Sequence, residues 1–171
     1  ASLARQPEVM VHGVATAAGL RRVLLEATVR LLGPGLGQAG QAADMLEAAA
    51  GSPVVQVWDA DALNLLALQP ERFIAAGPRI LTPHPGEAAR LLGWSAGEVQ
   101  AQREQAALQL ARQYQSVVVL KGHGSLIADP GGQLLVCRHG HPVMAGPGFG
   151  DVLGGVITAF VAQGMSSVDE A

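Results

Sequence analysis

Short apolar runs alternate along this chain with longer stretches in which apolar and polar residues recur at helical spacing. Four of the runs have the length of buried strands: Ala27–Leu32, Pro53–Trp58, Arg79–Thr82 and Val117–Leu120. The stretches between them predict helices: Ala39–Ala49, Ala62–Leu68, Glu87–Leu92 and one long helix from about Ala96 to Gln113. Strands that alternate with helices pair in parallel. The pattern therefore predicts an α/β fold with a mostly parallel central sheet and helices on both faces.

The last third of the chain changes pattern. Ser125–Ala128 and Gln133–Cys137 flank the turn-forming residues Asp129–Gly132, which predicts a β-hairpin. A final, strongly apolar helix is predicted to start near Asp151. The chain contains no internal repeat and no low-complexity linker, so we expect residues 1–171 to form a single domain.

Composition narrows the range of partners. The 171 residues are 49% apolar and include 22 glycines, a mixture that suits closely packed helices and glycine-rich ligand loops. The net charge is −3 without a basic run, so neither nucleic acid nor an anionic membrane is an expected partner. Cys137 is the single cysteine, which excludes an internal disulfide and a cysteine-rich metal site and fits a reducing compartment. No run reaches about 18 apolar residues, and the first residues lack the apolar core of a signal peptide. We therefore expect a cytoplasmic protein.

The final helix is preceded by a glycine-rich turn, Gly148–Gly150, and then Asp151. Such a turn presents unpaired N–H groups at the positive end of the helix dipole, which favours anion binding. Because a carboxylate repels a bound phosphate, its presence there suggests a chemical role. Asp151 is suited to accept a proton from a hydroxyl that attacks a phosphoryl group. The alternative is an ordinary acidic N-cap.

Two further turns carry candidate ligands of a nucleotide or metal. The loop Gly33–Gly40 contains G-x-G-x-x-G, and Asp59 follows about 20 residues later, which is the nominal dinucleotide fingerprint. The alternatives are a tight strand-to-helix turn or a loop that faces a substrate. Asp59 and Asp61 are suited to orient a metal-bound water or a ribose hydroxyl, and the alternative is that one of them caps the next helix.

Two strand ends carry other polar groups. His84 lies between two prolines that keep its backbone out of a helix, so we expect it to contact a ligand at the sheet edge. Glu87 either interacts favourably with the dipole of the helix that it begins or contacts a magnesium ion through water. Lys121 ends an apolar strand and precedes two glycines and Ser125, a combination suited to nucleotide phosphates. The sequence contains no P-loop, no Cys/His cluster and no G-x-S-x-G elbow.

Taken together, these turns resemble a known family. The matching segments are G-P-G-L-G (Gly33–Gly37), W-D-A-D-A-L-N (Trp58–Asn64), L-T-P-H-P-G-E-A-A-R-L-L-G (Leu81–Gly93), V-V-L-K-G-H-G-S (Val118–Ser125) and G-F-G-D-V-L-G-G (Gly148–Gly155). They resemble the ADP/ATP-dependent NAD(P)H-hydrate dehydratases, which have a ribokinase-like fold. The resemblance implies an enzyme that repairs NADH or NADPH whose ring has taken up water. A nucleotide, ADP in typical bacterial members and ATP in eukaryotic ones, phosphorylates the ring hydroxyl, and phosphate then leaves.

The resemblance also implies residue roles. Asp151 would be the base on the hydrate hydroxyl, next to an anion hole made by the amides of Gly148, Phe149 and Gly150. The nucleotide would be bound by one segment together with Gly150: Lys121, Gly122, His123, Gly124 and Ser125. Gly35 and His84 would contact the hydrate, as would Asp151. Asn64 and Glu87 would lie near Mg²⁺ and the phosphates.

The chain departs from the family pattern in two ways. Before Asp151 the family usually has G-N-P-G-M-A-[ST]-G-G-x-G-D, but four positions differ here: His141, Val143, Gly146 and Pro147. Pro147 removes one N–H from the loop, which alters the anion hole. Family domains are also longer at both ends, so we expect a partial domain that lacks N-terminal and C-terminal parts. The resemblance further implies a homo-tetramer and a fused or paired NAD(P)H-hydrate epimerase. Two alternatives stay open: another ribokinase-like small-molecule kinase, and a non-catalytic nucleotide-binding remnant.

Overall fold

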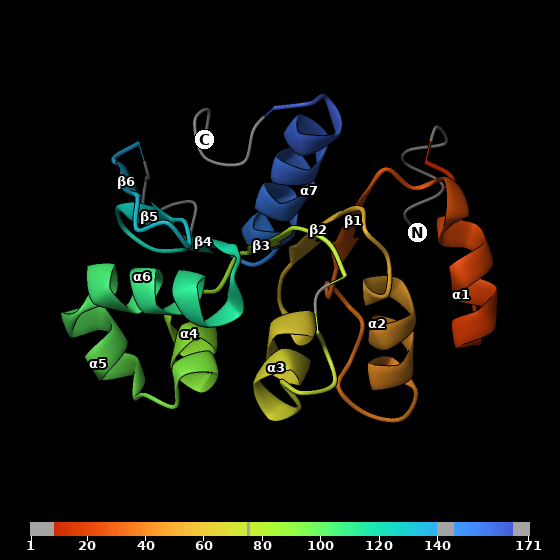
Figure 1. Ribbon diagram of the computed structural model, residues 1–171, viewed down its shortest axis with the longest axis horizontal. Helices are drawn as coiled ribbons and strands as arrows, with labels where there is room; N and C mark the ends of the chain where they lie inside the picture. The colour runs from red at the N-terminus through yellow and green to blue at the C-terminus, as the bar shows by residue number, and fades with distance from the viewer. Residues whose placement is uncertain (1–8, 75, 140–145, 166–171) are drawn as a thin grey trace.

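A six-stranded sheet forms the centre of the molecule (Figure 1). The computed structural model describes residues 9–74, 76–139 and 146–165. The strands lie side by side in sequence order: β1 (Val29–Leu32), β2 (Val55–Trp58), β3 (Arg79–Leu81), β4 (Val117–Leu120), β5 (Ser125–Ala128) and β6 (Leu134–Cys137). β1 to β4 are parallel, whereas β5 and β6 are antiparallel and form the predicted hairpin. The mostly parallel sheet is therefore confirmed.

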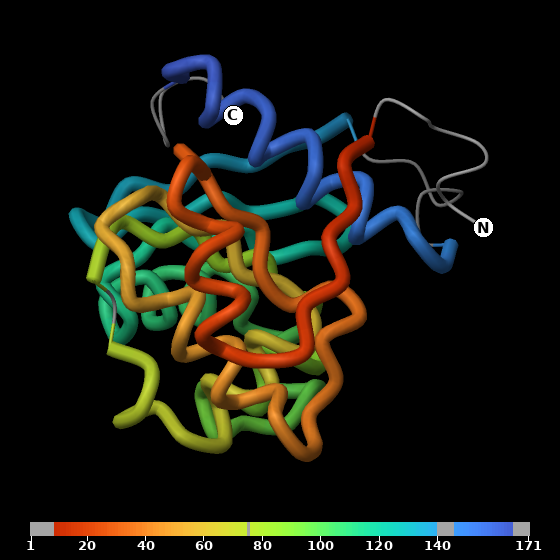
Figure 2. Tube along the Cα trace, turned by 90° about the vertical axis from the view of Figure 1, so that its right-hand side faces the viewer, coloured from red at the N-terminus to blue at the C-terminus, as the bar shows by residue number. Residues whose placement is uncertain are grey.

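The helices cover the two faces of the sheet unequally. One layer holds α2 (Ala42–Ala50), α3 (Asp61–Leu68), α4 (Pro85–Leu92), α5 (Ala96–Ala101) and α6 (Arg103–Tyr114). Parallel strands that follow in sequence order, each joined by a right-handed crossover, place every connecting helix on the same face. α7 (Phe149–Ala162) lies on the opposite face and packs on β1 and β2 (Figure 2). Helices on both faces are thus confirmed.

The sheet separates two apolar cores, because neighbouring residues of a strand point to opposite faces. On β2, Trp58 is fully buried against the α2–α6 layer, whereas the adjacent Val57 belongs to the core on the α7 side. α7 contributes Ile157 and Val161 to that second core. Gly154 lets α7 approach the sheet closely, since an added Cβ would lie 3.1 Å from Leu31. α7 is therefore packed closely against β1.

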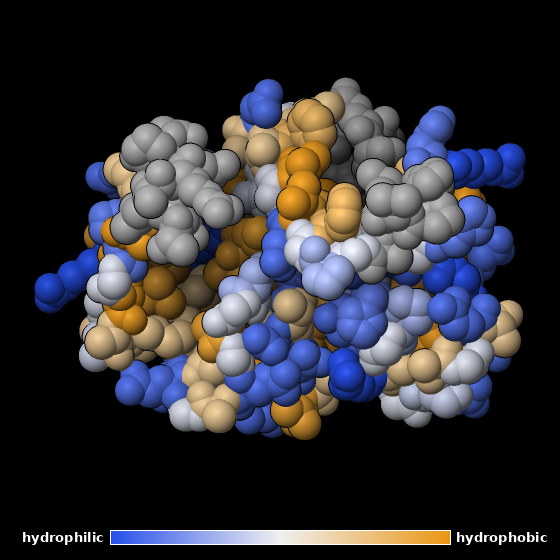
Figure 3. Space-filling model, turned by 180° about the vertical axis from the view of Figure 1, so that it is seen from behind, coloured by the Kyte–Doolittle hydropathy of each residue, from blue (hydrophilic) through white to orange (hydrophobic). Residues whose placement is uncertain are grey.

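The outward side of α7 carries apolar residues: Phe149, Val152, Val156 and Phe160 are exposed. Figure 3 shows apolar side chains gathered where α7 lies, in the upper middle of that view. Of the described helices, none has both the length and the apolar character needed to cross a membrane.

Two elements differ from the sequence expectation. The predicted long helix is two helices, because Gln102 (φ −133°, ψ 47°) ends α5 and precedes α6. The apolar period continues across the break, which is why the pattern indicated a single helix. α1 (Ala17–Val23) and the short 3₁₀ helix η1 (Leu24–Glu26) were not predicted. Neither contains a buried residue, so neither produces an apolar period.

Candidate active site

The turns after β1, β2, β3 and β4 gather at one edge of the sheet, as the parallel order requires. A buried ion pair crosses this edge: Lys121 Nζ, after β4, lies 2.7 Å from Asp59 Oδ1, after β2. The Asp59 side chain is 3% exposed and that of Lys121 is 19% exposed. A second carboxylate, Glu87, lies 3.9 Å from the same ammonium through Oε2. The lysine is therefore a fixed cation.

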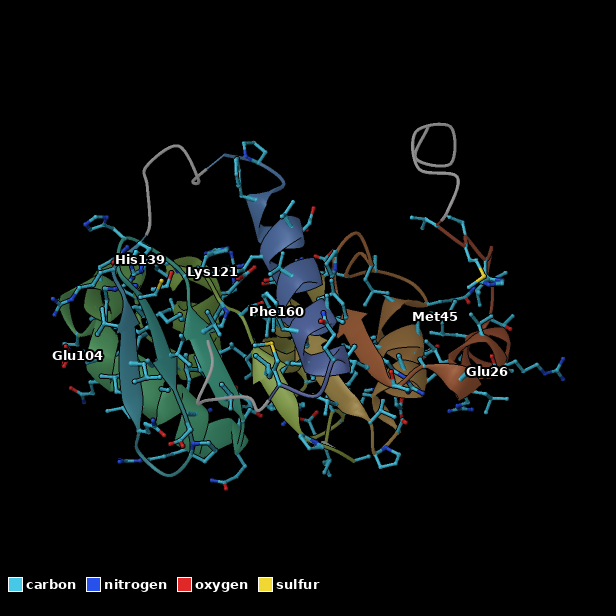
Figure 4. The ribbon with its side chains drawn as sticks, turned by 90° about the horizontal axis from the view of Figure 1, so that it is seen from above. Glu26, Met45, Glu104, Lys121, His139 and Phe160 are labelled. Atoms are coloured by element: carbon cyan, nitrogen blue, oxygen red, sulfur yellow. The ribbon has the colours of Figure 1, made fainter. Side chains whose placement is uncertain are left out.

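The first turn of α7 lies directly against this pair. A Cβ built on Gly150 would be 3.6 Å from both Asp59 Oδ2 and Lys121 Nζ. Figure 4 shows Lys121 beside the start of α7. Gly148 is the N-cap with φ +87°, so Gly150 and Asp151 are the second and third helical residues. Amides at these positions have no acceptor within their own helix. The structure thus brings first-turn amides and an ammonium group together, as an anion site requires.

Asp151 does not cap α7, because the N-cap is Gly148 and no side chain accepts a hydrogen bond at this helix start. The acidic N-cap alternative is therefore wrong. The residue is exposed in the first turn of α7, on the edge that holds Lys121. Phe149 N–H donates to Gly146 O over 3.4 Å, so of the three predicted anion-hole amides this one has an internal partner. Pro147 is exposed, whereas His141 and Val143 lie outside the described residues.

His84 and Glu87 form a capping box at the start of α4. The Nδ1 atom of His84 accepts from the N–H groups of Gly86 (3.0 Å) and Glu87 (3.4 Å). In return Glu87 Oε2 accepts from His84 N–H over 2.8 Å. Because Nδ1 accepts, the neutral imidazole carries its proton on Nε2. That Nε2 lies 3.3 Å from Glu87 Oε1, and the His84 side chain is half exposed.

Both groups of the capping box have shifted pKa values. Burial lowers the pKa of His84, and the positive charges of Lys121 and Arg90 lower it further. Burial raises the pKa of Glu87, although the hydrogen bond from His84 N–H and the nearby Lys121 oppose the rise. His84 therefore remains neutral further into the acid range than a free histidine.

The segment after β4, which is predicted to bind the nucleotide, is a turn held by hydrogen bonds to the end of β3 and to α6. Lys121 N–H donates to Pro83 O over 2.8 Å, which ties the turn to the end of β3. Arg103, the first residue of α6, donates to the carbonyl oxygens of Lys121 (3.4 Å), Leu120 (3.3 Å) and Gly124 (3.2 Å). Sequence reasoning missed this arginine. Its partners are main-chain oxygens, which leave no signal in the sequence.

Other parts of the predicted turn have different contacts. Ser125 Oγ donates to Gly122 O over 3.2 Å, and His123 is exposed. The Ser125 hydrogen bond therefore stays within the turn and involves neither Asp59 nor α7. The site core is thus Lys121 itself, with Gly122 to Ser125 forming its flank.

The glycine-rich loop lies beside the same edge. A Cβ on Gly33 would be 1.8 Å from the carbonyl oxygen of Asp59, so only glycine permits this close approach. Gly35 is exposed. Asp61 holds the loop, because its Oδ2 accepts from Gly37 N–H over 2.8 Å and its Oδ1 from Gln38 Nε2 over 2.9 Å.

One expectation and one open alternative for this region are wrong. The N-cap of α3 is Ala60, and no side chain caps that helix, so neither Asp59 nor Asp61 has the predicted capping role. The sheet also has sequential strand order, without the reversal at which a Rossmann domain binds its dinucleotide. The G-x-G-x-x-G loop is therefore no hydride-carrier fingerprint, and a close strand-to-helix turn explains Gly33.

The residues predicted near Mg²⁺ are already engaged by protein groups. Asn64 Oδ1 accepts from Arg90 Nη1 over 2.8 Å, and Glu87 Oε2 accepts from His84 N–H. Across residues 9–74, 76–139 and 146–165, no three His, Cys, Asp or Glu side chains converge on one metal position. Mg²⁺ commonly keeps several waters and takes its other ligands from substrate phosphates. The role of Asn64 and Glu87 near Mg²⁺ therefore stays a prediction.

Comparison with known proteins gives a consistent result. The chain is 47% identical over 166 residues to the bifunctional NAD(P)H-hydrate repair enzyme of Coxiella burnetii, covering 97% of this chain and 33% of that protein. It is 43% identical to the ADP-dependent (S)-NAD(P)H-hydrate dehydratase of Neisseria meningitidis, covering 82% of this chain and 48% of that one. The chain therefore spans a third to a half of the length of these relatives.

A solved structure shares the fold. The ADP/ATP-dependent NAD(P)H-hydrate dehydratase of Bacillus subtilis, co-crystallised with ATP and Mg²⁺, superposes with a TM-score of 0.74 at 28% identity. The match covers 93% of this chain and 56% of that one. A ribokinase-like protein of Enterococcus faecalis superposes with a TM-score of 0.82 at 31% identity, covering 94% of this chain and 56% of that one. The sequence model of the NAD(P)H-hydrate dehydratase family matches residues 1–171. The chain thus belongs to the NAD(P)H-hydrate dehydratase family.

Proposed function

We propose that this domain repairs hydrated NADH or NADPH by nucleotide-dependent dehydration, with ADP preferred over ATP. One observation carries the proposal: the Lys121 ammonium lies against Gly150 in the first turn of α7, the turn that carries Asp151. Phosphoryl transfer requires positive charge and N–H donors at the transferring group, with a base at the attacking hydroxyl. The C-terminal edge of this sheet provides all three.

Asp151 accepts the proton of the ring hydroxyl while that oxygen attacks the terminal phosphorus of ADP. The bond from this phosphorus to the bridging oxygen breaks, and AMP leaves with the electron pair. The amides of Gly148 and Gly150, together with Lys121, stabilise the charge on the transferring group. The C–O bond of the phosphorylated ring then breaks, phosphate leaves with the electron pair, and loss of a ring proton restores the double bond. Mg²⁺, when bound, neutralises charge on the phosphates, with Asn64 and Glu87 holding its waters.

Different residues around this centre bind the nucleotide and the hydrate. On the β4 side, the turn from Lys121 to Ser125 binds the nucleotide, and His123 and Gly124 line it. Gly35, after β1, and the half-exposed His84, after β3, contact the hydrate. The neutral imidazole presents its Nε2–H as a donor, which suits the uncharged ring amide of a nicotinamide.

The relatives support the finer points of the proposal. The Neisseria protein is named ADP-dependent, which supports ADP as the phosphoryl donor. The Coxiella protein is bifunctional and longer, which supports an NAD(P)H-hydrate epimerase fused to or paired with this domain. We further propose a cytoplasmic location and a homo-tetramer, both from the family resemblance.

The test incubates the full-length protein with hydrated NADH and either ADP or ATP, and follows the return of reduced-nicotinamide absorbance. We expect recovery with ADP, and none in Asp151→Asn, which should still bind the nucleotide. Asp44→Asn removes a carboxylate from the exposed side of α2 and should leave turnover unchanged. Phosphorylation of a small alcohol without recovery would favour another ribokinase-like kinase. Nucleotide binding without any turnover would favour a non-catalytic remnant.

A further inference from the structure

Three carbonyl oxygens of the Lys121–Ser125 turn, those of Lys121, Gly122 and Gly124, accept hydrogen bonds. Arg103 binds those of Lys121 and Gly124, and also that of Leu120 just before the turn. The hydroxyl of Ser125 binds the carbonyl of Gly122. One guanidinium therefore donates hydrogen bonds to carbonyl oxygens at both ends of the turn. Its planar fork of N–H donors suits several acceptors at once.

Arg103 has no charge partner that would explain its position. Its described polar partners are these carbonyls and the side-chain oxygen of Gln100, and none of them is a carboxylate. It is also the first residue of α6, where a cation opposes the helix dipole. Gly122 leaves room for it: with φ +145°, an added Cβ would lie 2.7 Å from Arg103 Nη1. The turn and the arginine are thus fitted to each other.

The direction of the carbonyls determines the direction of the amides. In a trans peptide the N–H points opposite to the C=O of the same peptide unit. Because Leu120 O binds Arg103, Lys121 N–H points away from it, and this amide indeed donates to Pro83 O at the sheet edge. By the same geometry Gly122 N–H points away from Arg103. Within the described part of the chain it has no acceptor.

This arrangement matters for an anionic ligand. A carbonyl oxygen on the ligand side would repel a phosphate, whereas successive N–H groups attract it. We propose that Arg103 is a positioning residue for nucleotide binding. It holds carbonyls of the turn inward, so that the Gly122 amide and the Lys121 side chain face the phosphates. The inference rests on the proposed nucleotide binding and adds a residue from α6 that touches neither ligand.

The test compares two arginines of the same helix in the full-length protein. Arg103→Met keeps the alkyl stem but removes the donors, and Arg112→Met makes the same change further along α6. Binding of ADP is measured by calorimetry, and KM and kcat by the return of reduced-nicotinamide absorbance. We expect Arg103→Met to raise Kd and KM for ADP about tenfold, with kcat at saturating ADP within about twofold. Arg112→Met should change neither.

The outcomes distinguish failure of the Arg103 inference from failure of the proposed function. Wild-type affinity and KM in Arg103→Met would overturn the inference and leave the proposed function standing. A loss confined to kcat would overturn it too, because a positioning role acts on nucleotide binding. Failure of the wild-type protein to bind ADP or ATP would instead defeat the proposed function. If circular dichroism shows that Arg103→Met does not fold, Arg103→Lys is decisive: it keeps the charge without the fork, and unchanged ADP binding by that variant would refute the proposal.

Discussion

Gly150→Ala separates the role of α7 in the fold from its role in the chemistry. The added methyl group would lie 3.6 Å from Asp59 Oδ2 and Lys121 Nζ, an ordinary van der Waals contact. Gly150 is helical, so alanine needs no backbone change. Alanine is favoured over glycine in a helix interior by about 1 kcal/mol, and by less in the first turn. We therefore expect the melting temperature to stay the same or rise by roughly 2–4 °C.

The same methyl group occupies the space next to the first-turn amides and Lys121, where the proposed reaction places a phosphoryl oxygen. Removal of one donor from an oxyanion hole costs about 10²–10³ in kcat. We expect a loss of about 10²-fold, since the methyl displaces the oxygen while both donors remain. The Asp59–Lys121 ion pair stays intact, because the methyl contacts it without overlap.

Gly155→Ala is the matched control on the same helix, because nothing lies within 4 Å of its added Cβ. It should give a similar gain in stability and full activity. Stability is measured by thermal unfolding followed by circular dichroism, and activity by the return of reduced-nicotinamide absorbance. A Gly150→Ala protein that is stable and fully active would refute the placement of the reaction at this turn. One that unfolds would refute the packing argument.

Three further predictions concern charges and caps near the site. Asp59→Ala leaves the partly buried Lys121 without its nearest partner and should lower the free energy of unfolding by about 3 kcal/mol in urea. Asp44→Asn, in an exposed ion pair, should lower it much less; equal losses would contradict the importance of the Asp59–Lys121 pair. Because burial raises the pKa of Glu87, the folded state holds that proton more tightly, and stability falls as the pH rises from the unfolded value of about 4.3 through the folded pKa. Glu87→Gln should reduce this fall, and an unchanged slope of unfolding free energy against pH would count against it. Because the pKa of His84 is lowered, its stabilising contribution is present above about pH 6.5 and is lost as the pH falls toward the folded pKa. His84→Asn keeps a cap and should remove this loss, whereas His84→Ala should cost about 1 kcal/mol even at neutral pH; identical melting curves for the two variants would exclude the capping role.

Much of the fold follows from local pattern. The runs at Pro53–Trp58 and Val117–Leu120 are short and mostly apolar, as buried strands are, and the structure has strands at Val55–Trp58 and Val117–Leu120. The break at Gln102 was unpredictable, because the apolar spacing of α5 continues into α6. α1 escaped notice for the opposite reason, since it buries no side chain and therefore has no apolar face.

The candidate site residues were predicted one by one, but the contacts between them were not. Lys121 and Asp59 each stand out as charges at the end of an apolar strand. Their pairing depends on β2 and β4 lying on either side of β3, and strand order is a tertiary property that no local pattern encodes. Arg103 was missed for a similar reason, because its partners are main-chain oxygens, which have no sequence signature.

Asp59 touches three segments that are far apart in the sequence. Its main-chain oxygen lies against Gly33, its carboxylate binds Lys121, and the same carboxylate lies next to Gly150. The proposed substrate loop, nucleotide turn and helix of the base thus share one neighbour. Residues with a common contact do not contribute independently to a free energy. Double-mutant cycles between these three turns should therefore show coupling energies well above zero, even for pairs of residues that never touch each other.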